Sequence, residues 1–200
     1  MTNIFKYTWP MIIIFLAILS SLRLVWLLKN KKSIILYREL IGLFFVIYIL
    51  FLFHIVTFQD VSWSTQNYTP FKEILRYELG SPLFIRNVLG NSLLFVPYGF
   101  FVAYYLKLTK ISPVILLTMF TSLVIEFTQK NIGRVFDIDD IILNIIGGVL
   151  GFFLYKLLEY LKEHLPSVLK KHAILNIILL VILVIVVFYF INYYVFEVLK

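Results

Sequence analysis

The amino-acid sequence contains no cysteine, and only 14% of its residues are charged. The absence of thiols excludes disulfides, zinc–thiolate sites and cysteine nucleophiles, so any chemistry must come from carboxylates, amides, hydroxyls or histidine. A soluble domain carries roughly 25% charged residues, because these side chains cover its water-facing surface. The shortage of charge therefore excludes water as the main solvent around this chain.

Apolar residues are abundant instead, at 62% of the sequence, and the mean hydropathy is +0.96. They gather in runs that are each long enough to cross a hydrocarbon core roughly 30 Å thick. The runs are 9–28, 40–58, 83–106, 111–128, 140–158 and 173–196. This pattern predicts an all-α fold, a polytopic membrane helix bundle of about six transmembrane helices with no sizeable soluble domain.

The formal net charge of +7 raises the question of nucleic-acid binding. The Lys and Arg residues lie between the apolar runs and form no surface stripe, so we expect no nucleic-acid partner. We interpret them as topology signals, since positive charge is retained on the cytoplasmic side of a membrane. The sequence thus predicts a multi-pass integral protein of the cell membrane, with both termini outside.

Polar side chains within the apolar runs are costly, and each is therefore a functional hypothesis. The run 111–128 carries polar residues at helical spacing, on the face that holds Thr118, Ser122, Glu126 and Gln129. A face of the run 140–158 carries Asp140, Asn144, Gly147 and Gly151. A third polar face, in the run 83–106, carries Asn87, Asn91 and Tyr98. These faces must look into protein and not into lipid.

Gly147 and Gly151, with Gly148 beside them, form a small-xxx-small surface. Such a surface permits the close approach of a neighbouring helix. We interpret these glycines as helix-packing residues.

The connector between the fourth and fifth runs is too short to wander far, so it holds Arg134 and Asp137 beside Glu126. An unpaired ionised carboxylate is strongly disfavoured there, which makes Arg134 the expected partner of Glu126 or of an aspartate. Capping of the fifth helix is an equally good explanation of Asp137 or Asp140 taken alone. We predict one pocket that opens to the outer face, lined by Asn91, Glu126, Gln129, Arg134, Asp137, Asp140 and Asn144.

Four motifs, taken in order along the chain, resemble the VanZ-like family. They are the segments 67–71 and 91–100, the Glu126-x-x-Gln129 pair, and the spaced pattern from Asp137 to Gly151. The resemblance implies a bacterial cell-membrane protein of a family associated with teicoplanin resistance, and it assigns no reaction. The resemblance covers 67–155 and predicts a VanZ-like core of three helices there. The apolar runs predict two N-terminal transmembrane helices and the start of an outer loop over 1–66, and an inner loop with a C-terminal helix over 156–200.

Three functions stay open on this evidence. The first is a non-enzymatic envelope protein that binds a membrane lipid, a lipid-linked cell-wall precursor or a lipophilic glycopeptide, with Arg134 meeting a phosphate. The second is a membrane-embedded enzyme acting on a lipid or polyprenyl phosphate, in which Asp137 and Asp140 would hold a divalent cation. The third is a small transporter or scaffold. No catalytic residue is assigned, no cofactor is expected, and a metal is expected only under the second hypothesis.

Overall fold

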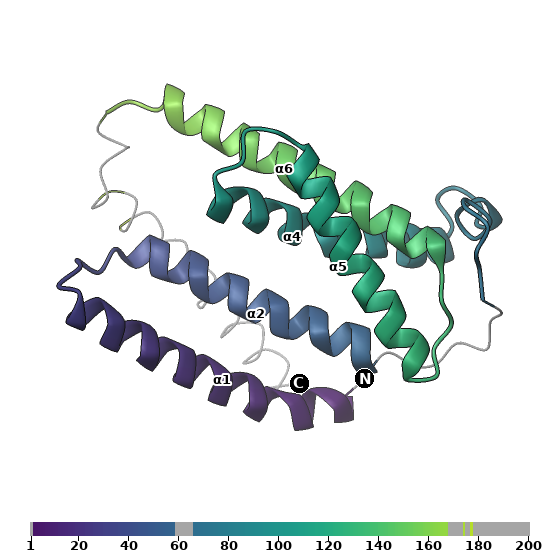
Figure 1. Cartoon of the computed structure of the whole chain (residues 1–200), viewed down its shortest axis with the longest axis horizontal. Helices are drawn as coiled ribbons and strands as arrows, with labels where there is room; N and C mark the ends of the chain where they lie inside the picture. The colour runs from purple at the N-terminus through teal and green to yellow at the C-terminus, as the bar shows by residue number, and fades with distance from the viewer. Residues whose placement is uncertain (1, 59–65, 168–173, 175–176, 178–200) are drawn as a thin grey trace, which may run out of the picture. The chain divides into compact units, whose positions relative to one another are not determined.

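The structure is a computed structural model, and it describes residues 2–58, 66–167, 174 and 177. Its ordered elements are all helical (Figure 1). They are α1 (Thr2–Lys29), α2 (Leu36–Phe58), the 3-10 turn η1 (Ile74–Arg76), α3 (Pro82–Phe84), the π-helical turn η2 (Ile85–Leu89), α4 (Gly90–Leu106), α5 (Ser112–Asn131) and α6 (Ile138–His164). No strand occurs in the described residues, so the prediction of an all-α fold is confirmed.

Four helical stretches within the described residues are long and apolar enough to cross a membrane: Leu36–Thr57, Pro82–Leu106, Ser112–Asn131 and Ile138–His164. They correspond to the second to fifth predicted runs. The first run lies in α1, which is not among the four, and the sixth lies outside the described residues except for 174 and 177. The structure therefore supports four of the predicted spans, and the total of about six stays a prediction.

The described residues form two compact units, which are considered separately. One unit, Tyr48–Tyr160, contains the end of α2, the helices α3 to α5 and most of α6, together with all the predicted site residues. The other combines residues up to Ile47 with those from Leu161 onward. Within that other unit, Arg23 of α1 pairs with Glu39 of α2, with 2.9 Å between Nε of Arg23 and Oε2 of Glu39.

In the Tyr48–Tyr160 unit, glycines bring α6 very close to both α4 and α5. A Cβ atom added to Gly147 would lie 2.0 Å from the carbonyl oxygen of Ser92, and one added to Gly151 would lie 2.1 Å from another α4 carbonyl oxygen. Gly148 faces α5, where an added Cβ would lie 2.4 Å from Oγ1 of Thr118. No side chain fits at such separations. The structure thus places these glycines where the three helices meet.

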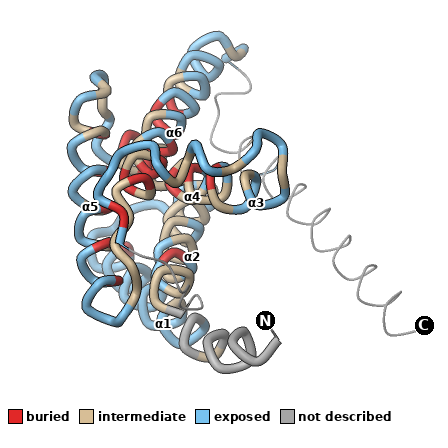
Figure 2. Tube along the Cα trace, turned by 90° about the vertical axis from the view of Figure 1, so that its right-hand side faces the viewer, coloured by how far each residue is buried: buried red, intermediate tan, exposed pale blue. Residues whose placement is uncertain are grey.

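Within the described part of the chain, the opposite faces of the spans are apolar and exposed. Exposed large side chains occur on every one of them, including Phe53, Leu93, Phe120, Phe127 and Phe153. Figure 2 shows the same contrast, with buried positions gathered along α4, α5 and α6 and exposed positions on their outer sides. Soluble monomers rarely expose apolar patches of this extent, whereas hydrocarbon covers them without cost.

Which end of the helices faces out of the cell is a prediction that cysteine labelling checks, because the chain has no native cysteine. Single cysteines at Gln66 and Ile132 should react with an impermeant thiol reagent in intact cells. Cysteines at Lys31, Lys110 and Ser167 should stay unlabelled until the membrane is permeabilised. Labelling at Lys110 but not at Ile132 would reverse the predicted orientation.

Candidate functional site

The site forms at the end of the Tyr48–Tyr160 unit where α5 ends, α6 begins and segment 66–81 approaches them. Gly133, with φ +87°, ends α5, since it adopts the left-handed conformation that side chains disfavour. The amide of Arg134 then donates to the carbonyl of Gln129 at 2.9 Å, and that of Gly133 to Lys130 at 3.3 Å. This is the Schellman arrangement, and it places Arg134 beside the last turn of α5.

Segment 66–81 is joined to the connector by a short parallel pairing. Asn67 and Asp137 form an isolated β-bridge, in which the amide of Asn67 donates to Phe136 at 2.9 Å and the amide of Ile138 donates to Asn67 at 3.1 Å. The side-chain amide of Asn67 also donates to Oδ1 of Asp137 at 2.8 Å. Asn67 is buried, so these bonds are shielded from water. The pairing brings together chain segments that the sequence separates by 70 residues.

The side chain of Asp139 holds the backbone of segment 66–81. Its carboxylate is 1% exposed and accepts hydrogen bonds from the amides of Phe71 (2.5 Å), Glu73 (2.7 Å) and Ile74 (3.2 Å). Charge-assisted bonds of this kind are roughly twice as strong as neutral ones. Asp139 was not predicted as a site residue. It nevertheless makes more hydrogen bonds to segment 66–81 than any of the predicted site residues does. No local signal in the sequence identifies it, because Asp137 and Asp140 stand nearby and its partners lie 65 to 68 residues earlier in the chain.

Asp137 is the N-cap of α6. Its Oδ1 accepts from the amide of Asp139 at 2.9 Å, which satisfies one of the free N–H groups of the first helical turn. Burial raises the pKa of the Asp137 carboxyl, and the hydrogen bonds from Asp139 and Asn67 oppose that rise. The capping explanation is therefore correct for Asp137, alongside its contact with Asn67.

Glu126 and Arg134 are linked through Gln129, and the expected direct ion pair is absent. Glu126 is 1% exposed, and its Oε2 accepts from the amide of Asp137 at 3.0 Å. With its amide oriented to satisfy both neighbours, Gln129 donates to Oε1 of Glu126 at 3.1 Å and accepts from Nη1 of Arg134 at 2.7 Å. Nη1 also donates to the carbonyl of Val56 at 2.8 Å.

No ion pair in the described part of the chain includes Arg134, so the prediction of direct pairing with a carboxylate is wrong. The Schellman turn and the carbonyl of Val56, at the end of α2, direct the guanidinium to amide and carbonyl oxygens instead. Arg134 consequently does not line the cavity described below, and its proposed contact with a phosphate has no support there.

Two further predicted residues make pairs between helices. Asn91 of α4 donates to Oδ1 of Asp140 at 2.5 Å, and Asn144 of α6 donates to Oγ of Ser122 in α5 at 2.8 Å. Asn144 and Ser122 are both buried. The first pair lies beside the cavity, whereas the second is a polar contact inside the helix bundle.

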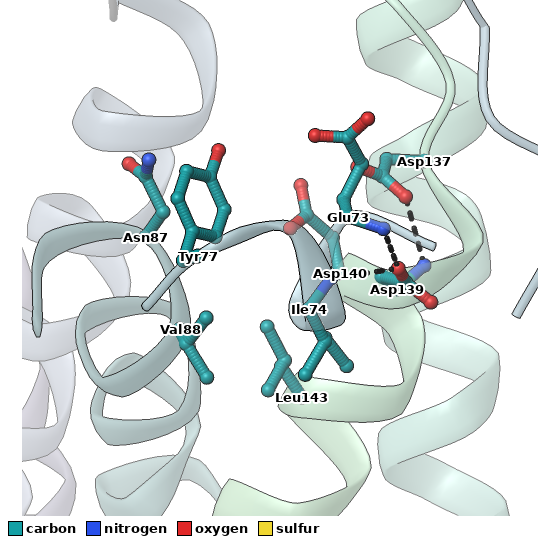
Figure 3. Close-up of a pocket in the computed structure, with 9 residues that line it drawn as sticks. All are labelled: Glu73, Ile74, Tyr77, Asn87, Val88, Asp137, Asp139, Asp140 and Leu143. Carbon is teal, nitrogen blue, oxygen red and sulfur yellow. Dashed lines mark hydrogen bonds between the residues drawn. The ribbon is translucent and has the colours of Figure 1, made fainter. Parts of the chain in front are cut away.

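A cavity of about 40 Å³ lies between segment 66–81, the π-helical turn η2 and the start of α6 (Figure 3). Its wall contains the carboxylates of four residues, an amide, a phenol and apolar side chains. The lining residues are Glu73, Ile74, Tyr77, Asn87, Val88, Asp137, Asp139, Asp140 and Leu143. The volume admits about one to three water-sized groups.

The predicted pocket is thus divided in the structure. Asp137 and Asp140 line the cavity, while Glu126, Gln129 and Arg134 form a hydrogen-bonded chain behind it. Sequence reasoning did not anticipate the contribution of segment 66–81, which supplies Glu73, Ile74 and Tyr77. Within the described residues, no group of three or more His, Cys, Asp or Glu side chains is arranged to hold a metal ion.

The fold and the site together define an all-α membrane protein in which acidic and amide side chains at one end of the helices tie down a connecting segment. The chain belongs to the VanZ/LLP1 family, whose model matches residues 40–159. The predicted family is confirmed, and the match extends N-terminally beyond the predicted 67–155 to include most of α2. No curated protein and no solved structure matches the chain.

Proposed function

We propose that this protein is a non-enzymatic, multi-pass protein of the bacterial cell membrane that binds the amine-bearing head group of a membrane lipid or lipid-linked cell-wall precursor. Such binding would lower the sensitivity of the cell to lipophilic glycopeptides such as teicoplanin. The observation that carries the proposal is the acidic lining of the cavity, whose wall contains Glu73, Asp137, Asp139 and Asp140.

No Lys or Arg of the described residues lines the cavity, so a phosphate inside it would meet the carboxylates directly. The guanidinium of Arg134 is engaged with Gln129 and Val56, and that of Arg76 lies 3.2 Å from the carboxylate of Glu73 with a largely exposed side chain. Charges interact strongly where water is scarce, so this wall favours a cation and repels an anion.

The volume of the cavity limits the ligand groups that can enter it. A cavity of about 40 Å³ admits a primary ammonium, with Asp140 and the phenol of Tyr77 available as hydrogen-bond acceptors. A trimethylated ammonium is bulkier and has no N–H to donate. The ligand group we propose is therefore a primary amine.

Native mass spectrometry of the purified protein tests the proposal with phosphatidylethanolamine and phosphatidylcholine of identical acyl chains. The wild-type protein should retain the ethanolamine lipid preferentially. Asp140→Asn should abolish the preference, because it removes one charge from the wall while keeping the side-chain shape. Glu78→Gln, an exposed change outside the cavity, is the matched control and should leave the preference intact.

Equal retention of both lipids by the wild-type protein would contradict an amine site. Preferential retention of a lipid phosphate without an amine would favour anion binding instead. In cells, Asp140→Asn should lose any protection against teicoplanin that the wild-type protein confers at equal expression.

A further inference from the structure

The side chains of segment 66–81 fall into two groups of different character. Glu73, Ile74 and Tyr77 line the cavity. Phe71, Leu75 and Leu79, named here the apolar strip, are instead 53%, 81% and 87% exposed. Three large apolar side chains this exposed within one short segment indicate contact with something other than water.

The strip cannot turn toward the cavity, because hydrogen bonds hold the backbone of the segment in place. The amides of Phe71, Glu73 and Ile74 donate to the buried carboxylate of Asp139. The side chains of Ile74 and Tyr77 already line the cavity. The strip is therefore presented outward by the same hydrogen bonds that build the site.

The apolar strip continues into the lipid-facing surface of a membrane span. Pro82 begins the stretch Pro82–Leu106, directly after segment 66–81. Exposed apolar side chains follow along it at Leu83, Ile85, Leu89 and Leu93. Since that surface belongs in hydrocarbon, the strip just before it lies at the depth where the hydrocarbon meets the head groups.

The charges of the segment favour burial of the strip at the bilayer boundary over binding to an oppositely charged partner. It carries Lys72 and Arg76 together with Glu73 and Glu78, so its formal charge is balanced. Lys72, Arg76 and Glu78 are exposed and can keep their charged ends in water while their stems lie along apolar surface. A balanced segment has no net attraction to anionic head groups, which leaves apolar burial as the driving force.

We propose that the segment inserts Phe71, Leu75 and Leu79 into the head-group and acyl-chain boundary of the bilayer that contains α4. The segment then acts as an interfacial anchor that sets the cavity at head-group depth. This inference goes beyond the proposed function and does not depend on it, because the strip can insert whether or not the cavity binds an amine.

Site-directed fluorescence tests the insertion in the full chain, which has no native cysteine to interfere. Single cysteines at Leu75 and Leu79 are labelled with an environment-sensitive fluorophore after reconstitution into phosphatidylcholine vesicles. A cysteine at Lys110, an exposed position between α4 and α5, is the water-facing control. Lipids carrying a quencher near the head group should quench the labels at 75 and 79 severalfold more strongly than the label at 110. Aqueous iodide should show the reverse order.

Iodide quenching at 75 and 79 as strong as at 110 would overturn the proposal. So would lipid quenching that appears only when anionic phosphatidylglycerol is added, since apolar insertion does not need it. Protection of the labels from iodide could also be lost when the protein-to-lipid ratio is lowered. That result would show that a second copy of the chain, and not the bilayer, covers the strip, and it would overturn the proposed insertion. Asp139→Ala with the cysteine at 75 should reduce lipid quenching, because the segment is then no longer held.

Discussion

Replacing Asp139 with alanine should release segment 66–81 and lower the free energy of unfolding by about 3 kcal/mol or more. The carboxylate accepts three backbone amides, from Phe71, Glu73 and Ile74. A hydrogen bond to a charged group contributes roughly 1.5 to 3 kcal/mol to stability, and three such bonds are lost here. Relief of the buried charge offsets part of this loss.

Hydrogen exchange of the detergent-solubilised protein measures the effect directly. The amides of 71, 73 and 74 should lose protection in Asp139→Ala, while those in the middle of α5 keep theirs. Asp139→Asn should be intermediate, because it retains one acceptor oxygen. The control is Glu78→Ala, which removes an exposed carboxylate from the same segment. Unchanged protection in Asp139→Ala would show that the segment is held by other contacts.

The second large effect is expected from adding a single methyl group at Gly147. An added Cβ would lie 2.0 Å from the Ser92 carbonyl oxygen and 3.0 Å from the Phe95 Cβ, so α4 and α6 must move apart. Overpacking of this kind costs about 1 to 3 kcal/mol, and here the obstacle is backbone and cannot rotate away. Gly147→Ala should therefore lower the midpoint of thermal unfolding in detergent, and Gly147→Leu should prevent stable folding.

Gly90→Ala is the matched control, since Gly90 is also helical and an added Cβ would meet only the Ile85 carbonyl oxygen at 3.7 Å. That substitution should be neutral or should raise stability by roughly 0.5 to 1 kcal/mol, through the lower entropy of the unfolded chain. Equal tolerance of alanine at 90 and 147 would contradict the close packing of α4 on α6.

The family and the helical class were predictable because both depend on local features. Apolar runs of span length and polar faces at helical spacing can be read along one stretch of chain. The capping role of Asp137 was predictable for the same reason, as its partner lies two residues away. The sequence predicted the glycine surface of α6. It did not predict which helices pack against that surface.

The site was predicted only in part, because its decisive contacts join distant segments. Asp139 binds amides 65 to 68 residues earlier in the chain, and no local pattern distinguishes it from the aspartates on either side. Arg134 was expected to meet a carboxylate on grounds of charge alone. The turn that ends α5 places the Arg134 guanidinium beside Gln129 and the carbonyl of Val56. Arg134 is therefore linked to Glu126 only through the side-chain amide of Gln129.

By itself the sequence determined that this chain belongs in a membrane, that its spans are helices and that one polar end carries the VanZ/LLP1 motifs, since composition and periodicity are properties of neighbouring residues. The tertiary structure alone decided which partner each carboxylate of the site binds. Asp140 and Asp139 are adjacent in sequence, yet the helical turn sends one to Asn91 and the other to segment 66–81. That division depends on where α4 and the segment lie, and packing sets those positions.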